Sequence, residues 1–259
     1  MRQVTEELVT AYGKSLQQQV AAGEMAVSYA QNLLSSVNVV LETMRGDSVL
    51  RVSPSELVGE RSSVRREAPA GMERERLQQA TSELRERGEE RVAVVAELAR
   101  ELGLRFREAS LLDARAALAQ ATEIGAVNIT AGTKGGRGHV VDRWVPVLAV
   151  PTLTLEKAAE VQGAGRNLIP EGNSYAQWRD HAYHAWSQVA RDNELKGFHD
   201  LRAAYACDRY EQLTGYPAPV VNGERLADKA LDLSARETIS SELGHGRVDV
   251  VSAYVGSAR

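Results

Sequence analysis

The sequence has little of several features that mark common protein classes. Its 259 residues include one cysteine, Cys207, and only 5% aromatic residues. A single cysteine excludes an internal disulfide framework and is typical of a reducing compartment. No apolar run reaches the ~18 residues of a membrane span, and residues 1–7 do not form the apolar stretch of a signal peptide. These absences predict a cytoplasmic protein.

The sequence also contains no complete nucleotide or metal motif. The glycine-rich segment 132–138 carries Lys134 but lacks the Gly-Lys-Ser/Thr ending of a phosphate-binding loop, and there is no G-x-G-x-x-G. His181 and His184 are three residues apart on a predicted helix, without a third ligand spaced nearby. We therefore expect no cofactor and no metal. Cys207 is expected to be a small buried apolar residue.

The composition that remains favours helices. Hydrophobic residues make up 43% of the chain, mostly Ala, Val and Leu, which is enough for one large domain or two smaller ones. The net charge of −4 argues mildly against a nucleic-acid partner, because phosphate-binding domains are usually basic. Basic residues can still gather on one surface. Local clusters occur at Arg61, Arg65 and Arg66, at Arg105 and Arg107, and at Lys134 and Arg137.

Apolar spacing predicts a small helical domain at the start of the chain. Helices are expected over 5–22 and 26–44, and Ser53-Pro54 is typical of the start of a further short helix. A change of composition, with Pro69 and Gly71, predicts a linker near 68–71. The domains are therefore expected at 1–68 and 72–259.

The second domain is predicted to be mainly α with a small antiparallel β-sheet. A β-hairpin is expected from 126–130 and 139–147, which flank the glycine-rich segment. Gly215 to Pro219 breaks the chain. The helices are expected at 72–86, 89–102, 105–112, 113–120, 153–161, 174–192, 199–213, 234–242 and 247–254.

Two arginines and a histidine suggest chemistry on a phosphodiester. Paired guanidiniums match phosphate oxygens and can stabilise the transition state, for which Arg105 and Arg202 are the candidates. His199 is three residues before Arg202 and shares its helix face. It could accept the proton of a nucleophile or bond a phosphate oxygen. Taken alone, Arg105 is more simply a surface arginine.

Three further residues complete the set. His245 follows Leu243-Gly244 and could donate to a nonbridging oxygen, and Tyr254, nine residues later, could attack the phosphorus. Phenols usually titrate near ~10, so a tyrosine nucleophile needs cationic neighbours and a base. Lys134 could protonate the leaving 5′-oxygen. Taken alone, Lys134 is more simply a solvated loop residue, and Tyr254, one of eight tyrosines, is more simply a structural residue.

The joint order of these residues resembles the tyrosine recombinase (phage integrase) family. It runs Gly-Leu-Arg-x-x-Glu at 103–108, the hairpin Lys134, His-Asp-Leu-Arg at 199–202, Leu-Gly-His at 243–245 and Tyr254. The resemblance implies a clamp around duplex DNA, a 3′-phosphotyrosyl intermediate, and strand exchange in a homotetramer without metal or ATP. It implies that Arg105 and Arg202 hold the phosphate, Lys134 is the general acid, His199 and His245 assist, Glu108 supports the site and Tyr254 attacks.

The same resemblance implies a DNA-binding first domain of the helical core-binding type and a nucleoid-associated location. Asn173-Ser174-Tyr175-x-x-Trp178 looks like integrase-domain proteins of mobile bacterial elements. The arginines expected to contact DNA are Arg61, Arg65, Arg66, Arg107 and Arg137.

The chain departs from the family in three places. An insertion near 213–233 lengthens the gap between Arg202 and His245, only five residues follow Tyr254, and the first domain is short. These departures put tail exchange between subunits in doubt and predict a weaker grip on DNA. Two alternatives stay open: a catalytically idle DNA-binding relative, and a DNA-relaxing topoisomerase with the same phosphotyrosine chemistry.

Overall fold

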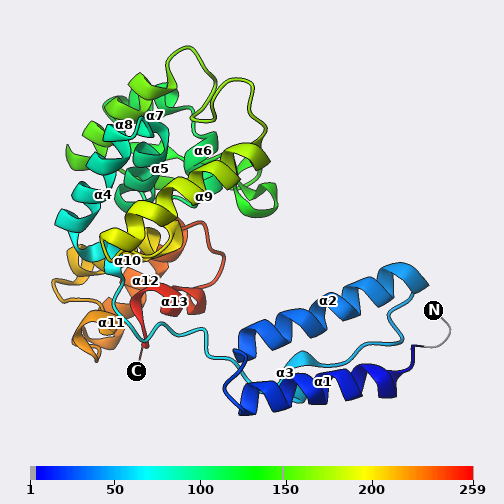
Figure 1. Ribbon diagram of the computed structural model, residues 1–259. Helices are drawn as coiled ribbons and strands as arrows, with labels where there is room; N and C mark the ends of the chain where they lie inside the picture. Colours follow the sequence, from blue (N-terminus) through cyan, green and yellow to red (C-terminus); the bar gives the residue numbers. More distant parts are fainter. Residues whose placement is uncertain (1–3, 148, 259) are drawn as a thin grey trace. The chain divides into compact units, whose positions relative to one another are not determined.

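The computed structural model describes residues 4–147 and 149–258, which divide into two compact units (Figure 1). The first unit is Met1–Ser63 and the second is Val64–Arg259. The division lies a few residues before the linker predicted at 68–71. The backbone N–H of Arg65 already donates to the carbonyl of Ser252 at 2.9 Å, so the chain belongs to the second unit from that point.

The first unit contains three helices around one apolar core. They are α1 (Glu6–Ala21), α2 (Val27–Arg45) and α3 (Pro54–Val58), close to the predicted ranges. Asn38 bonds the backbone of Val52 in both directions, at 2.9 and 3.2 Å, which holds the segment after α2 against that helix. The core residues are Val9, Leu16, Ala30, Leu34, Leu41, Leu50, Val52 and Val58.

The second unit is mainly helical, as predicted from the sequence. Its central helix, α5 (Glu90–Glu101), is buried along most of its length and packs against α4 (Arg74–Glu86), α8 (Ala149–Gln162) and α10 (Phe198–Thr214). Two tryptophans of α9, Trp178 and Trp186, are buried in the same core. The other long helices are α4 (Arg74–Glu86), α7 (Ala114–Ile124), α8 (Ala149–Gln162), α9 (Tyr175–Asp192), α10 (Phe198–Thr214) and α12 (Lys229–Glu242).

Short elements connect these helices and carry much of the candidate site. They are the 3₁₀ turns η1 (Ala70–Met72), η2 (Lys134–His139) and η3 (Asp249–Val251), and the helices α6 (Phe106–Leu111), α11 (Pro219–Asn222) and α13 (Ser252–Val255). The helix predicted over 247–254 is therefore only a 3₁₀ turn followed by one helical turn. Two other helices begin earlier than predicted: α8 at Ala149 rather than 153, and α12 at Lys229 rather than 234. Asp228 accounts for the second difference, because its side chain accepts from the first N–H groups of α12 at 2.9 Å.

The predicted hairpin is present but shorter. Strands β1 (Ala126–Asn128) and β2 (Trp144–Pro146) pair antiparallel, with Val127 opposite Val145. The prediction of strands over 126–130 and 139–147 was wrong in length, because the turn after η2 continues to Val141, where the N–H groups of Val140 and Val141 donate to the carbonyl of Arg137 at 3.0 and 2.9 Å. Within η2, Gly135 and Gly136 have φ of 66° and 70°, which turns the chain away from an extended path.

None of the described helices is long and apolar enough to cross a membrane.

Candidate active site

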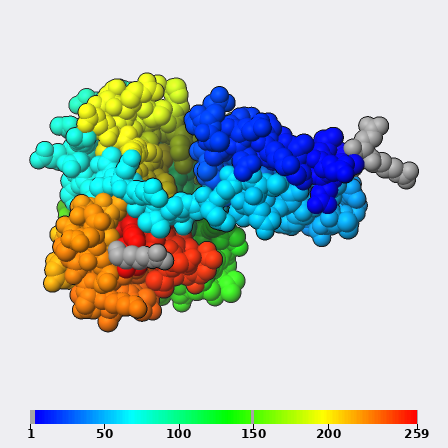
Figure 2. All heavy atoms as spheres, turned by 90° about the horizontal axis from the view of Figure 1, so that it is seen from below, coloured from blue at the N-terminus to red at the C-terminus, as the bar shows by residue number. Residues whose placement is uncertain are grey.

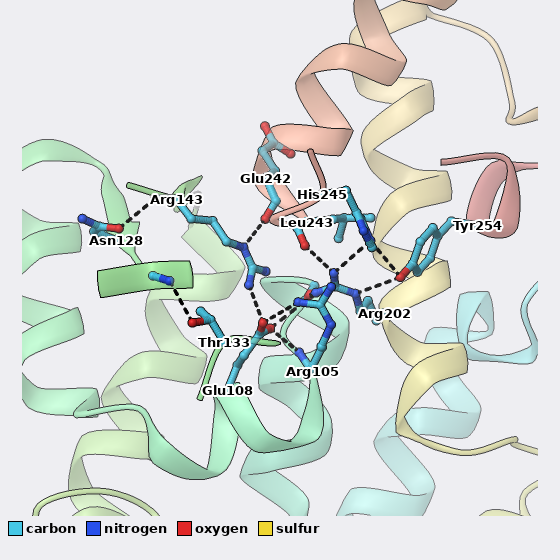
Figure 3. A network of polar contacts seen from close by, with 12 residues as sticks. Arg105, Glu108, Asn128, Thr133, Arg143, Arg202, Glu242, Leu243, His245 and Tyr254 are labelled. Atoms are coloured by element: carbon cyan, nitrogen blue, oxygen red, sulfur yellow. Dashed lines mark hydrogen bonds and ion pairs between the residues drawn. The ribbon is translucent and has the colours of Figure 1, made fainter. Parts of the chain in front are cut away.

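The spacing Arg-x-x-Glu at 105–108 has a direct structural cause. Arg105 caps the N-terminus of α6, and Glu108 is the third residue of that helix. The Glu108 carboxylate accepts from the backbone N–H of Arg105 at 2.7 Å and from its Nη1 at 2.6 Å (Figure 3). The helix start thereby fixes the direction of the Arg105 side chain, which remains partly exposed.

Two more arginines reach the same carboxylate. Arg143 Nη1 lies 2.8 Å from Glu108 Oε1, and Arg202 Nη1 lies 3.5 Å from Oε2. Burial disfavours ionisation of Glu108, but Arg143, Arg202 and Arg105 outweigh it and lower its pKa to about 2. One buried carboxylate thus faces three guanidiniums, and this group, the Glu108 cluster, has an excess of positive charge.

Arg202 is oriented by backbone carbonyls. It is fully buried on α10, where Nη1 donates to the carbonyl of Gly103 and Nη2 donates to that of Leu243 at 2.5 Å. Burial lowers the pKa of Arg202 to about 10, so the guanidinium is charged at neutral pH. Gly103 has φ of 60°, and a Cβ there would lie 2.5 Å from the ring of Tyr205. The glycine of the Gly-Leu-Arg motif therefore also places its own carbonyl where Arg202 Nη1 donates to it.

The phenol of Tyr254 points into this group (Figure 3). Its Oη lies 3.1 Å from His245 Nε2 and 3.5 Å from Arg202 Nε. The same His245 nitrogen lies 3.4 Å from Arg202 Nη2, which can only donate. Nε2 is consequently best assigned as the unprotonated nitrogen, which lets the phenol donate to it.

His245 is a neutral base at physiological pH. Burial is the main cause, followed by the positive charge of Arg202, and together they lower its pKa to about 3. The sequence suggested that His245 would donate to a nonbridging oxygen. The structure instead gives it the phenol as a partner.

His199 lies beside the tyrosine on another side. Its ring centroid is 5.3 Å from that of Tyr254, and its side chain is exposed. Desolvation by the surrounding protein, and then the charge of Arg202, lower its pKa. Among the described residues, the hydrogen-bond partners of the phenol oxygen are His245 and Arg202, so His199 is not the group placed to take its proton here.

A cavity of about 290 Å³ opens beside the Glu108 cluster. Arg105, Lys134 and His245 contribute to its wall, and basic side chains outnumber acidic ones around it. Arg202, His199 and Tyr254 do not line it. The charged and histidine residues of the wall are Arg105, Glu108, Lys134, Arg137, Asp142, Arg143, Glu237, His245 and Arg247.

Arg143 is the site residue that the sequence did not reveal. Arg143 is 4% exposed, and its Nε donates to the carbonyl of Glu242 at 2.7 Å. Its backbone N–H donates to the side-chain oxygen of Asn128 at 3.0 Å. Gly244 has φ of 65°, and a Cβ there would lie 2.8 Å from Arg143 Cδ. The glycine of Leu-Gly-His therefore makes room for Arg143. In the sequence Arg143 stands inside a predicted strand, where no spacing pattern marks it.

The arginines predicted to contact DNA have different surroundings. Arg61 lies in the first unit, and Arg61 and Arg66 are exposed. Arg107 is exposed with its guanidinium 5.4 Å from the centre of the Tyr175 ring, and Arg137 lines the cavity. Arg65 differs from these four, because its guanidinium pairs with the buried Asp200 inside the protein.

The remaining candidates behave as ordinary residues. His181 bonds Glu89 at 2.8 Å and His184 bonds Gln188 at 3.0 Å. Within the described ranges, no three His, Cys, Asp or Glu residues are grouped as a metal site. Cys207 is buried, as predicted, and burial raises the pKa of its thiol to about 12.

Residues 59–208 match the integrase family, and this segment is more than half of the chain. The chain belongs to the integrase family. The matched segment includes Arg105, Glu108, Lys134, His199 and Arg202 and ends before His245 and Tyr254. The structure therefore supplies what the family match leaves open, since it brings these last two residues against Arg202. Among curated proteins no match was found.

Solved structures show the same fold. A lambda integrase dimer bound to a COC′ core site aligns with a TM-score of 0.58 and 17% identity, over 97% of this chain and 64% of that one. A lambda integrase segment, also a dimer on a COC′ core site, gives 0.55 and 16%, over 95% and 80%. The chain thus spans 64% of the length of the first structure. The helical fold with its small sheet is the fold of these lambda integrase structures.

Proposed function

We propose that this chain is a site-specific recombinase that cuts and rejoins duplex DNA through a bond between Tyr254 and the 3′-phosphate. The carrying observation is the contact of the phenol with His245 Nε2 at 3.1 Å and Arg202 Nε at 3.5 Å. A nucleophile, a neutral base and a buried cation are thus held together. Eight tyrosines occur in the chain, and the charged surroundings of Tyr254 are what favour it.

In the proposed step, the protein and the DNA supply every group that is bonded, displaced or protonated. Tyr254 Oη bonds the phosphorus while the bond from phosphorus to the 5′-oxygen breaks, and the phenol proton passes to His245 Nε2. Lys134 protonates the leaving 5′-oxygen, and Arg105 and Arg202 stabilise the negative charge of the transition state. The energy of the broken ester is kept in the phosphotyrosyl ester, so rejoining needs neither ATP nor a metal.

The Glu108 cluster explains how the site can receive a phosphodiester. Three guanidiniums around one carboxylate leave positive charge that a phosphate group would balance. The cavity wall offers Arg105, Lys134 and His245 to that group. We propose that the scissile phosphate binds there and that Tyr254, which does not line the cavity, moves past His245 to reach it. Glu108 keeps the arginines in place without neutralising them.

The wider DNA contacts extend the same proposal. The first domain, 1–68 as predicted from the sequence, would bind duplex DNA as a core-binding domain. Arg61, Arg66, Arg107 and Arg137 are the exposed or cavity-lining arginines proposed to contact phosphates. The two lambda integrase structures hold dimers on DNA, and we propose that this chain assembles further, as a homotetramer, for strand exchange.

Covalent trapping tests this function. Wild-type protein and Tyr254→Phe are mixed with nicked duplexes from the ends of the DNA element that carries the coding sequence, then denatured and examined for protein-linked DNA. We expect an adduct with wild type only, because the substituted ring has no oxygen to attack, while DNA binding persists. Tyr216→Phe is the matched control, since Tyr216 is an exposed tyrosine that follows the C-terminal end of α10 and is not part of the Glu108 cluster.

The other outcomes separate the alternatives. An adduct formed by Tyr254→Phe would refute Tyr254 as the nucleophile. Wild type that binds the DNA without any adduct would favour an idle DNA-binding relative. Relaxation of any supercoiled plasmid by a monomer would favour a topoisomerase over a recombinase.

A further inference from the structure

The segment that enters the second unit touches the helix of the proposed nucleophile. The backbone N–H of Arg65 donates to the carbonyl of Ser252 at 2.9 Å, and Ser252 opens α13 two residues before Tyr254. In the space-filling view the cyan chain after residue 64 runs against the red C-terminal segment (Figure 2). This contact is independent of the Arg65 side chain.

The side chain of Arg65 turns to a different helix. Its Nη2 pairs with a carboxylate oxygen of Asp200, and its Nε donates to the carbonyl of Glu67 at 2.8 Å. Asp200 is 6% exposed, stands between His199 and Arg202 on α10, and accepts from the N–H of Gly71 at 3.0 Å through its other oxygen. One residue therefore joins the start of α10 to the start of α13.

The helix α13 depends on such contacts for its position. It has four residues, and a single helical turn is not stable by itself. From α12, Arg236 donates to the carbonyls of Gly256 and Ser257, each at 3.1 Å, and fixes the end of the turn.

At the beginning of the turn, Arg236 Nη1 also donates to the Ser252 hydroxyl at 3.3 Å, and the backbone bond from Arg65 is a second contact there. With the contact of Cys207 Sγ on α10 with the Tyr254 carbonyl at 3.7 Å, these contacts set the position of Tyr254 beside α10.

We infer that Arg65 is a positioning residue that holds Tyr254 against Arg202, acting through the Arg65–Asp200 ion pair and the Arg65–Ser252 backbone bond. This inference rests on the proposed role of Tyr254 as the nucleophile. It differs from a role of Arg65 in contacting DNA, which the cluster of arginines at 61–66 suggests. The two roles affect different steps, because a phosphate contact supports binding and a positioning contact supports cleavage.

The test compares Arg65→Ala, Asp200→Asn and the double variant with wild type. Single-turnover cleavage of the nicked duplex is measured at saturating DNA, and DNA affinity is measured over a series of salt concentrations. Lys196→Ala is the matched control, because it removes a cation that pairs with Glu67 of the same segment at 3.0 Å, on the exposed surface. Arg65→Lys tests whether the charge alone is enough.

We expect Arg65→Ala to slow cleavage on the order of tenfold to a hundredfold, the scale of a small misplacement of a reacting group. DNA affinity and its salt dependence should stay as in wild type. Asp200→Asn should slow cleavage similarly, the double variant should be no slower than the slower single variant, and Arg65→Lys should lie between. Lys196→Ala should cleave at the wild-type rate.

Two results would overturn the inference. The first is normal cleavage by both Arg65→Ala and Asp200→Asn at saturating DNA. The second is weaker DNA binding by Arg65→Ala with a salt slope lowered by about 1, which is the sign of a lost phosphate contact. Thermal unfolding monitors folding, and if Arg65→Ala does not fold, Arg65→Lys and Asp200→Asn decide the question. Wild type without an adduct would refute the proposed nucleophile itself, and with it this role.

Discussion

Two buried ionic groups in the second unit are built on opposite principles. In the Glu108 cluster, one carboxylate faces Arg105, Arg143 and Arg202. In the Asp232–Arg236 pair on α12, one carboxylate faces one guanidinium at 2.9 and 3.0 Å. Arg236 also donates to the carbonyls of Gly256 and Ser257 and to the hydroxyl of Ser252. The first group has uncompensated charge and the second has none.

The difference in charge balance distinguishes the Glu108 cluster, the proposed phosphate site, from the Asp232–Arg236 pair, which holds segments of the chain in place. A buried charge without a partner is costly, so an excess of arginines is retained where an anion will bind. A balanced pair, in contrast, can serve to hold segments in place. Here Arg236 of the pair holds residues on both sides of Tyr254, while the cluster contacts the Tyr254 phenol through Arg202. The two groups should therefore respond differently to substitution.

The largest effect is expected when the cluster loses Arg202. Arg202→Ala should slow single-turnover cleavage, and the lost transition-state stabilisation should exceed the ~2.7–4 kcal/mol of one lost oxyanion donor. The reason is that a full charge and several hydrogen bonds disappear. Cleavage at saturating DNA measures this loss. A reduction of less than about tenfold, or ~1.4 kcal/mol, would contradict the assigned role.

The balanced pair should instead show its effect in stability. Asp232→Asn leaves the Arg236 guanidinium, which is 3% exposed, without a counter-charge. We expect a loss of ~3–5 kcal/mol in the free energy of unfolding, the usual result of breaking a buried ion pair. Urea denaturation measures it.

An exposed pair provides the control for this loss. Arg179 and Asp180 form a solvent-exposed ion pair at 2.7 Å, and Asp180→Asn should leave the unfolding midpoint unchanged. Equal midpoints for Asp232→Asn and wild type would show that the Asp232–Arg236 pair does not hold segments of the chain in place.

The last effect concerns the dependence of stability on pH. In the folded protein the pKa of His245 is lowered to about 3 from an ordinary 6.5, so the folded state binds fewer protons than the unfolded chain below pH 6.5. The contribution of His245 to stability is then complete above pH 6.5 and declines as the pH falls from 6.5 towards 3. The lowered pKa of His199 acts in the same direction.

Glu108 should act in a lower pH range. Its pKa is lowered to about 2 from 4.5, so its contribution is complete above pH 4.5 and is lost as the pH falls towards 2. Unfolding free energies measured from pH 7 to pH 3 test both statements. His245→Gln should reduce the decline over the whole range from pH 6.5 to 3, and the decline that remains below pH 4.5 is the contribution of Glu108. An unchanged decline in that variant would exclude His245 as a contributor.

Most helices of the fold, and part of the arrangement of the candidate site, could be predicted from the sequence. The helices of the first unit, α9 and α10 were expected within one or two residues, because their apolar spacing is a local property. The hairpin length was not, since the turns of η2 and the bonds of Asn128 decide where pairing stops. The contact between Arg105 and Glu108 follows from their spacing in the sequence, because both residues lie in the first turn of one helix.

By itself, the sequence determined the helical class and predicted the residues of the proposed phosphodiester site: Arg105, Glu108, Lys134, His199, Arg202, His245 and Tyr254. Tertiary structure alone decided that Arg143 completes the Glu108 cluster, that His245 rather than His199 meets the phenol, and that Arg65 pairs with Asp200. Periodicity and capping act between residues a few positions apart. These three contacts join residues on separate elements, and only the folded chain brings them within bonding distance.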